Sequence, residues 1–178
     1  MVILGIDPGT AITGYGVVKT NIAKHLPQDR NEKPRVVDFG CVTTTKFDSP
    51  GKRLQIIHAK ITKLIEKHKP DVISIESLYF FKNLKTAMPV SQAKGVILLA
   101  AAQKNIPVLE FTPLQVKMAV VGYGRAEKKQ VQEMTKQLLD LSTFDVKKKS
   151  RKKDDAADAL GIALCAILAK NQLWRIEP

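Results

Sequence analysis

The sequence predicts an α/β protein with a mixed five-stranded sheet that has helices on both faces. Three strand-like segments come first with no helix between them, and this order predicts an antiparallel meander. After them, strands alternate with helical segments, which is typical of parallel pairing through crossover connections. The meander followed by this alternation implies a mixed sheet, and because crossover helices cover the faces of a sheet, we expect helices on both sides. The 178 residues fit one domain, residues 1–178, with a single full core.

The predicted strands are short apolar runs with many β-branched residues, separated by turn-forming residues. They cover Val2–Asp7, Gly14–Val18, Val36–Thr44, Asp71–Glu76 and Pro107–Phe111. Between the second and third strands, Thr20–Arg35 is polar and contains proline. We therefore expect a long exposed hairpin loop there.

Helices are predicted from apolar residues at helical spacing and from capping signals. They cover Gly51–His68, Thr86–Lys104, Pro113–Val121, Ala126–Leu139 and Asp155–Lys170. Thr112 is the expected N-cap of the third helix, with Pro113 at its first position. Pro89 is compatible with the second helix only if it lies in the first turn.

The chain is strongly basic, with 29 Lys and Arg against 17 Asp and Glu and a net charge of +12. This charge favours nucleic acid or an anionic membrane surface as the partner. No apolar stretch is long enough to span a membrane. Of the two kinds of partner we expect nucleic acid and no membrane. The N-terminus leads directly into a strand without a signal peptide, and the two cysteines form no CxxC motif. These features predict a cytoplasmic protein.

Acidic residues stand at three places where apolar neighbours predict burial. Asp7 ends the first strand, Glu76 ends the fourth, and Asp155 and Asp158 open the last helix. Carboxylates are rarely buried unless they are paired or bind a metal, and converging carboxylates raise one another's pKa. Mg²⁺ relieves this repulsion by oxygen coordination. Two such ions can activate water and stabilise the leaving oxygen of a phosphodiester.

Spacing alone does not decide which acids of the last helix face the others. Asp155 and Asp158 are three residues apart, and Asp154 and Asp158 are four apart, so both pairs are neighbours on a helix surface. Asp154 also suits the N-cap, with Asp155 in the first turn. Caps and isolated salt bridges remain the alternative explanation of all these acids.

Short motifs run along the chain from Val2 to about Lys170. In order they are Ile6-Asp7-Pro8-Gly9-Thr10, Thr13-Gly14-Tyr15-Gly16-Val17, Ile75-Glu76, Gln92-Ala93-Lys94-Gly95-Val96, Gln115-Val116-Lys117, Val120-Val121-Gly122, Ala126-Glu127-Lys128 and Asp155-Ala156-Ala157-Asp158-Ala159-Leu160. With these motifs in this order, the chain resembles the RuvC family of bacterial Holliday-junction resolvases. The resemblance implies an RNase H-like fold, a homodimer, and Mg²⁺-dependent symmetric nicking of four-way DNA junctions in recombination and repair. It also implies two Mg²⁺ per active site, replaceable by Mn²⁺, and a branch-migration helicase partner of the RuvA and RuvB type.

The resemblance assigns roles residue by residue. It implies that Asp7, Glu76, Asp155 and Asp158 are the metal-binding catalytic acids, which favours Asp155 over Asp154. Lys117 and Lys128 match family positions that contact DNA near the scissile phosphate, although either lysine alone is typical of a solvated helix. Tyr79 matches a position where the family has an aromatic that stacks on junction bases. Phe80 and Phe81 follow it, so the sequence leaves open which ring meets the DNA.

Six basic residues in a run of seven precede the last helix. They are Lys147, Lys148, Lys149, Arg151, Lys152 and Lys153. Such a block is usually a solvated loop, and its place at the mouth of an anion-processing site makes phosphate contact the alternative.

Other functions fit the sequence less well. Asp7-Pro8-Gly9-Thr10 also resembles the phosphate loops of sugar kinases and actin-like ATPases, but those proteins need a second related domain, and no second Asp-x-Gly-Thr is present. A related nuclease for structured RNA is disfavoured by the Asp155 and Asp158 pair together with Lys117 and Lys128. A catalytically inactive binding module is disfavoured because all four acids are present.

Overall fold

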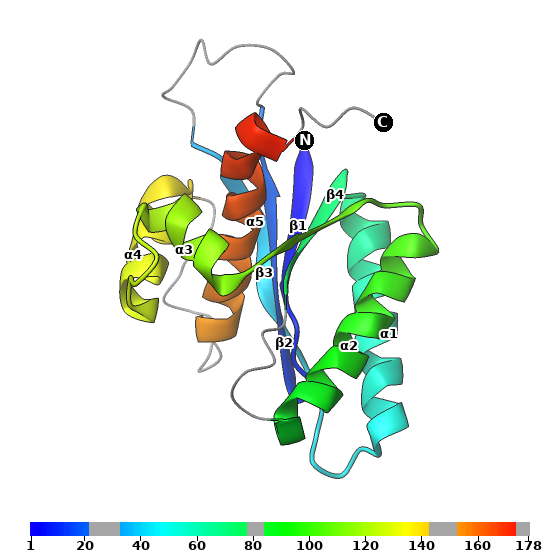
Figure 1. Ribbon diagram of the computed structural model, residues 1–178. Helices are drawn as coiled ribbons and strands as arrows, with labels where there is room; N and C mark the ends of the chain where they lie inside the picture. The colour runs from blue at the N-terminus through cyan, green and yellow to red at the C-terminus, as the bar shows by residue number, and fades with distance from the viewer. Residues whose placement is uncertain (22–32, 78–83, 143–152, 174–178) are drawn as a thin grey trace.

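A five-stranded mixed sheet lies between two layers of helices in the computed structural model, which describes residues 1–21, 33–77, 84–142 and 153–173 (Figure 1). The strands are β1 (Val2–Asp7), β2 (Ile12–Lys19), β3 (Arg35–Thr43), β4 (Val72–Glu76) and β5 (Val108–Phe111). Their order in the sheet is β3-β2-β1-β4-β5. The first three strands pair antiparallel, and β4 pairs parallel with both β1 and β5. The predicted mixed five-stranded sheet is confirmed.

Helices cover both faces of the sheet, as predicted (Figure 1). One face carries α1 (Pro50–His68) and α2 (Leu84–Ala102), and the other carries α5 (Lys153–Leu173). The shorter helices α3 (Pro113–Val121) and α4 (Lys128–Leu138) pack against α5. Among the described helices, none combines the length and the apolar character that crossing a membrane requires.

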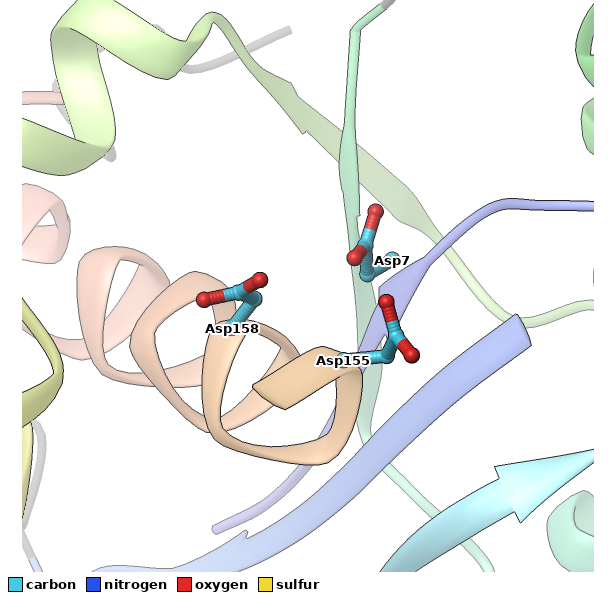
Figure 2. Close-up of side chains that lie close together, drawn as sticks. All are labelled: Asp7, Asp155 and Asp158. Carbon is cyan, nitrogen blue, oxygen red and sulfur yellow. The ribbon is translucent and has the colours of Figure 1, made fainter. Parts of the chain in front are cut away.

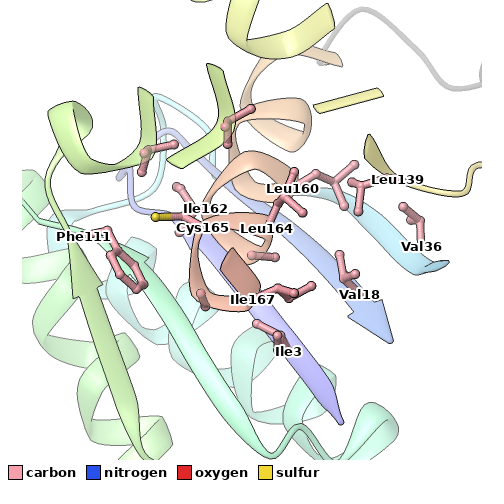
Figure 3. Close-up of a cluster of buried hydrophobic side chains, with 14 of the residues drawn as sticks. Ile3, Val18, Val36, Phe111, Leu139, Leu160, Ile162, Leu164, Cys165 and Ile167 are labelled. Atoms are coloured by element: carbon pink, nitrogen blue, oxygen red, sulfur yellow. The ribbon is translucent and has the colours of Figure 1, made fainter. Parts of the chain in front are cut away.

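Alternation along each strand separates two buried clusters of side chains. Ile3 of β1 points into the cluster on the α5 side, whereas Leu4 and Ile6 point into the cluster beneath α1 and α2. Figure 3 shows the α5 side, where Val18 and Phe111 pack with residues of the helix. The next residues of β1 on this face, Gly5 and Asp7, therefore also point toward α5.

Small residues let α5 lie directly on the sheet. Gly5 pairs with Gly16 of β2 and with Ser74 of β4, so the three form one row across the strands. A Cβ on Gly5 would lie 2.7 Å from the backbone nitrogen of Ala163 in α5, closer than atoms can pack. The buried Ser74 hydroxyl donates a hydrogen bond of 2.8 Å to the Ile162 carbonyl of the same helix. Glycine inside a strand often marks such close approach of another backbone.

Three local predictions are corrected by the structure. The second helix begins at Leu84 instead of Thr86, so Pro89 lies inside it, beyond the first turn. The fourth helix begins at Lys128, with Glu127 as the N-cap. Helix α5 begins at Lys153, which puts Asp154 in the first turn and not at the N-cap. Capping signals are short and repeat along a polar segment, so they fix a helix start only to within one or two residues.

The remaining boundaries agree closely with the sequence. Thr112 caps α3, and its side chain and that of Gln115 form a reciprocal capping box. Strand β2 is longer than the predicted Gly14–Val18 at both ends. Most of the predicted Thr20–Arg35 loop, residues 22–32, lies outside the described residues.

Candidate active site

Two acids lie side by side at the ends of the parallel strands β1 and β4. Ile6 pairs with Ile75, so the next residues along each strand, Asp7 and Glu76, are neighbours across the sheet. Strand alternation puts both on the α5 side, in line with Gly5 and Ser74. Both side chains are half-buried.

The first turns of α5 bring two more acids to this edge. Gly14 pairs with Asp7, and a Cβ on Gly14 would collide with the Asp155 carbonyl, lying 2.5 Å from its carbon. The backbone of Asp155 therefore rests on β2 directly beside Asp7. One carboxylate oxygen from each of Asp7, Asp155 and Asp158 lies within 4.8 Å of the other two, and Figure 2 shows the three side chains side by side. Asp154 is exposed and is not part of this group.

Burial and mutual repulsion act on the acids of the strands. Burial raises the pKa of Asp7 to about 7, with further contributions from the negative charges of Glu76, Asp158 and Asp155. The pKa of Glu76 is also raised, first by burial and then by Asp158. Lys128 opposes both shifts. Among the residues that the structure describes, the negative charge of the four acids exceeds the positive charge that Lys128 supplies.

Helix α4 contacts the cluster through two residues that are one turn apart. The Lys128 ammonium lies 2.5 Å from Oδ2 of Asp158, and this ion pair is the main cause of a raised pKa of Lys128. The Gln132 side-chain amide donates a hydrogen bond of 3.0 Å to Oδ1 of Asp158. Sequence reasoning missed Gln132, although its spacing of four residues from Lys128 puts both on one helix face.

Comparison with known proteins now identifies the family. The sequence model of the family described as crossover junction endodeoxyribonuclease RuvC matches residues 3–166 of this chain. The chain belongs to the RuvC family. The RuvC endonuclease of Ruminiclostridium cellulolyticum is 48% identical over 165 residues, covering 93% of this chain and 90% of that relative.

Solved structures agree with this membership. The chain is similar to the Thermus thermophilus RuvC structure, with a TM-score of 0.79, 29% identity and 96% of both chains covered. It is also similar to T. thermophilus RuvC in complex with Holliday junction substrate, with a TM-score of 0.78 and 30% identity, covering 94% of this chain and 93% of that one. Together with the strand order, these similarities confirm the RNase H-like fold predicted from the resemblance.

The other residues that the RuvC resemblance singled out are only partly described. Lys117 lies half-buried on α3, and in the described part of the chain no ion pair or hydrogen bond joins it to the acids. Lys153 begins α5, but its side chain is not described. The others lie outside the described residues: Tyr79, Lys147, Lys148, Lys149, Arg151 and Lys152.

The RuvC-family acids fit a hard divalent cation. The described cluster offers carboxylate oxygens, which Mg²⁺ and Mn²⁺ prefer, and no nitrogen or sulfur ligand. The described histidines bond elsewhere, His58 to Gln103 and His68 to Asp38. The pKa of Asp7 is raised first by burial and then by the neighbouring carboxylates, and a bound cation would relieve the repulsion among these charges. Donor type and electrostatics thus both favour metal binding here.

Proposed function

We propose that this chain is a structure-selective endonuclease that resolves four-way (Holliday) DNA junctions by paired, symmetric, Mg²⁺-dependent nicks in recombination and repair. The observation that carries this proposal is the group of Asp7, Asp155 and Asp158 oxygens within 4.8 Å. Membership of the RuvC family supports it, since relatives are crossover junction endodeoxyribonucleases and a similar structure holds Holliday junction substrate. The net charge of +12 suits a polyanionic substrate.

The four acids hold the metal in this mechanism. Asp7, Glu76, Asp155 and Asp158 would hold two Mg²⁺ per site, and Mn²⁺ could replace them. When bound, the ions supply an activated water and stabilise charge on the leaving oxygen. Asp7 takes up a proton near neutral pH without metal and must release it for metal to bind. Packing of α5 on Gly5 and Gly14 fixes the helix acids against β1, which preorganises the site.

Basic and aromatic residues bind the DNA. Lys128 stands at the acids and is placed to contact the scissile phosphate, and Lys117 binds phosphate nearby. Tyr79 stacks on bases at the junction centre. The basic run holds the DNA backbone through Lys147, Lys148, Lys149, Arg151, Lys152 and Lys153.

The protein acts as a homodimer through α2. Met88 and Leu99 are large apolar residues on this helix, yet 63% of Met88 and 50% of Leu99 are exposed. Gln92 and Gly95, both exposed, lie between them, so the four residues have the four-three-four spacing of one helix face. A Cβ on Gly95 would meet nothing within 4 Å, which leaves room for a close partner. Two symmetric nicks need two sites related by a two-fold axis, and a second copy on this face provides them.

Leu99→Glu should convert the dimer to monomer, because it places two charges against each other at the two-fold interface. Analytical ultracentrifugation and the ratio of paired to single nicks in each junction would measure this. Phe47→Glu is the matched control: Phe47 is 86% exposed and lies outside α2, so it should leave the dimer intact. A Leu99→Glu protein that stays dimeric would rule out this face as the interface.

Metal and junction dependence test the function itself. Purified protein is incubated with a four-way junction and with a linear duplex of the same sequence, in Mg²⁺, Mn²⁺, Ca²⁺ or EDTA. Nicking should occur only on the junction and only with Mg²⁺ or Mn²⁺, while Ca²⁺, with its looser geometry, should support binding better than cleavage. Full nicking in excess EDTA, or equal cleavage of the linear duplex, would contradict the proposal.

Residues 1–178 form a single domain, which the packing of both core clusters on one sheet supports. A branch-migration helicase complex of the RuvA and RuvB type delivers the junction, and the protein works in the cytoplasm. Family membership supports both statements.

A further inference from the structure

Both carboxylate oxygens of Asp158 are engaged by helix α4. Lys128 holds Oδ2 through an ion pair, and Gln132 holds Oδ1 through a hydrogen bond. The same carboxylate also contributes an oxygen to the cluster with Asp7 and Asp155. One side chain is thus shared by a lysine, an amide and a site suited to a cation.

We propose that Lys128 and a divalent cation compete for Asp158, and that Gln132 is a positioning residue that keeps the Asp158 carboxylate in place during the exchange. The proposal rests on the metal-binding role of Asp158 proposed above. It adds an order of events: loading of metal releases Lys128, which then becomes available to a DNA phosphate.

Electrostatics makes the two cations competitors. An ammonium and a divalent ion at one carboxylate repel each other, so each weakens the binding of the other. Linkage requires the effect to be reciprocal: if Lys128 lowers metal affinity, metal must loosen the contact of Lys128 with Asp158 by the same factor. Lys117 cannot play this part in the described structure, since no ion pair joins it to the acids.

The two α4 residues differ in what they can do once metal binds. The Lys128 side chain is 59% exposed and flexible, so it can leave Asp158 by rotation without moving the helix. Gln132 is half-buried and neutral, so it can keep its hydrogen bond to Oδ1 next to a cation. Because both residues lie on one face of α4, the helix itself can stay in place while the lysine moves.

Titration of the DNA-free protein with Mn²⁺ by calorimetry tests the competition directly. Lys128→Gln should bind Mn²⁺ roughly fivefold more tightly than the unchanged protein, as expected for removal of a partly exposed ion pair. Lys129→Gln is the matched control, because it removes the same charge from the adjacent exposed position of α4. The control should change the affinity less than twofold. Equal or weaker Mn²⁺ binding by Lys128→Gln would overturn the competition.

Chemical labelling measures the reciprocal effect on the lysine. An amine-reactive reagent followed by mass spectrometry reports how accessible each ammonium is, with and without saturating Mn²⁺. Labelling of Lys128 should rise several-fold on addition of Mn²⁺, while labelling of Lys129 stays constant. Unchanged labelling of Lys128 at saturating Mn²⁺ would also overturn the proposal. If the unchanged protein binds no Mn²⁺ at all, the proposed metal-dependent function fails together with the competition. If it binds Mn²⁺ but Lys128 labelling stays the same, only the competition fails.

The role of Gln132 needs a measurement that simple loss of stability does not affect. Gln132→Ala should weaken Mn²⁺ binding several-fold, because the Asp158 carboxylate loses the donor that orients it. Gln137→Ala is the control, an exposed glutamine one turn and a residue further along α4. Both variants are compared at temperatures well below their thermal midpoints. If Gln132→Ala binds Mn²⁺ as well as the control does, Gln132 is not a positioning residue.

Discussion

Asp158→Asn is expected to lower the rate of junction nicking by several orders of magnitude while junction binding survives. The substitution keeps the shape of the side chain but removes one of the charges that would hold the cations. A misplaced metal loses both activation of water and stabilisation of the leaving oxygen. In the proposed function, junction binding comes from basic side chains and aromatic stacking spread over the dimer surface. Without metal it should therefore be retained or slightly strengthened, since one negative charge facing the phosphates is gone.

The matched control lies four residues earlier on the same helix. Asp154→Asn removes the same charge from the first turn of α5, but Asp154 is exposed and outside the cluster of Asp7, Asp155 and Asp158. Its nicking rate should stay close to that of the unchanged protein. Junction affinity by gel shift and single-turnover nicking rates are measured for both variants. Loss of nicking in Asp154→Asn with full activity in Asp158→Asn would mean that the wrong face of α5 has been assigned.

Gly14→Ala should damage the site from the β2 side, because the added side chain would push α5 away from the sheet. The added Cβ would collide with the backbone of Asp155. A flexible side chain could rotate away from such a collision, but the backbones of α5 and β2 cannot. We expect a loss of roughly 3 kcal/mol in the free energy of unfolding, typical of severe overpacking. A shift of the Asp155 carboxylate by about 1 Å should also lower nicking by roughly 10²-fold.

Urea denaturation and nicking assays on folded protein measure the two effects separately. Gly51→Ala is the control, because a Cβ at this exposed position of α1 would meet nothing within 4 Å. Alanine there should be neutral or slightly stabilising, since it restricts the unfolded chain. Unchanged stability and activity of Gly14→Ala would show that α5 does not depend on this close approach.

Much of the architecture followed from local patterns in the sequence. The apolar run that ends at Asp7 predicted its strand to the residue, and the run that ends at Glu76 predicted a strand that begins one residue too early, at Asp71 instead of Val72. Both predictions rest on the continuous apolar segment that a buried strand needs. The capping residues Thr112 and Pro113 predicted the start of α3 to the residue. The same logic failed at Pro89, because contacts beyond the helix can stabilise a proline that local rules exclude.

The sequence by itself determined which carboxylates are candidates, and its net charge of +12 favoured a polyanionic partner. Spacing could not choose between Asp154 and Asp155, because both are helix-surface neighbours of Asp158. The tertiary structure decided this, since the contact of Asp155 with Gly14 joins residues far apart in the chain. Gln132 reaches Asp158 for the same reason, through the packing of α4 on α5. Periodicity and caps report on neighbours along the chain, whereas an active site is made of contacts between distant segments that only the folded backbone brings together.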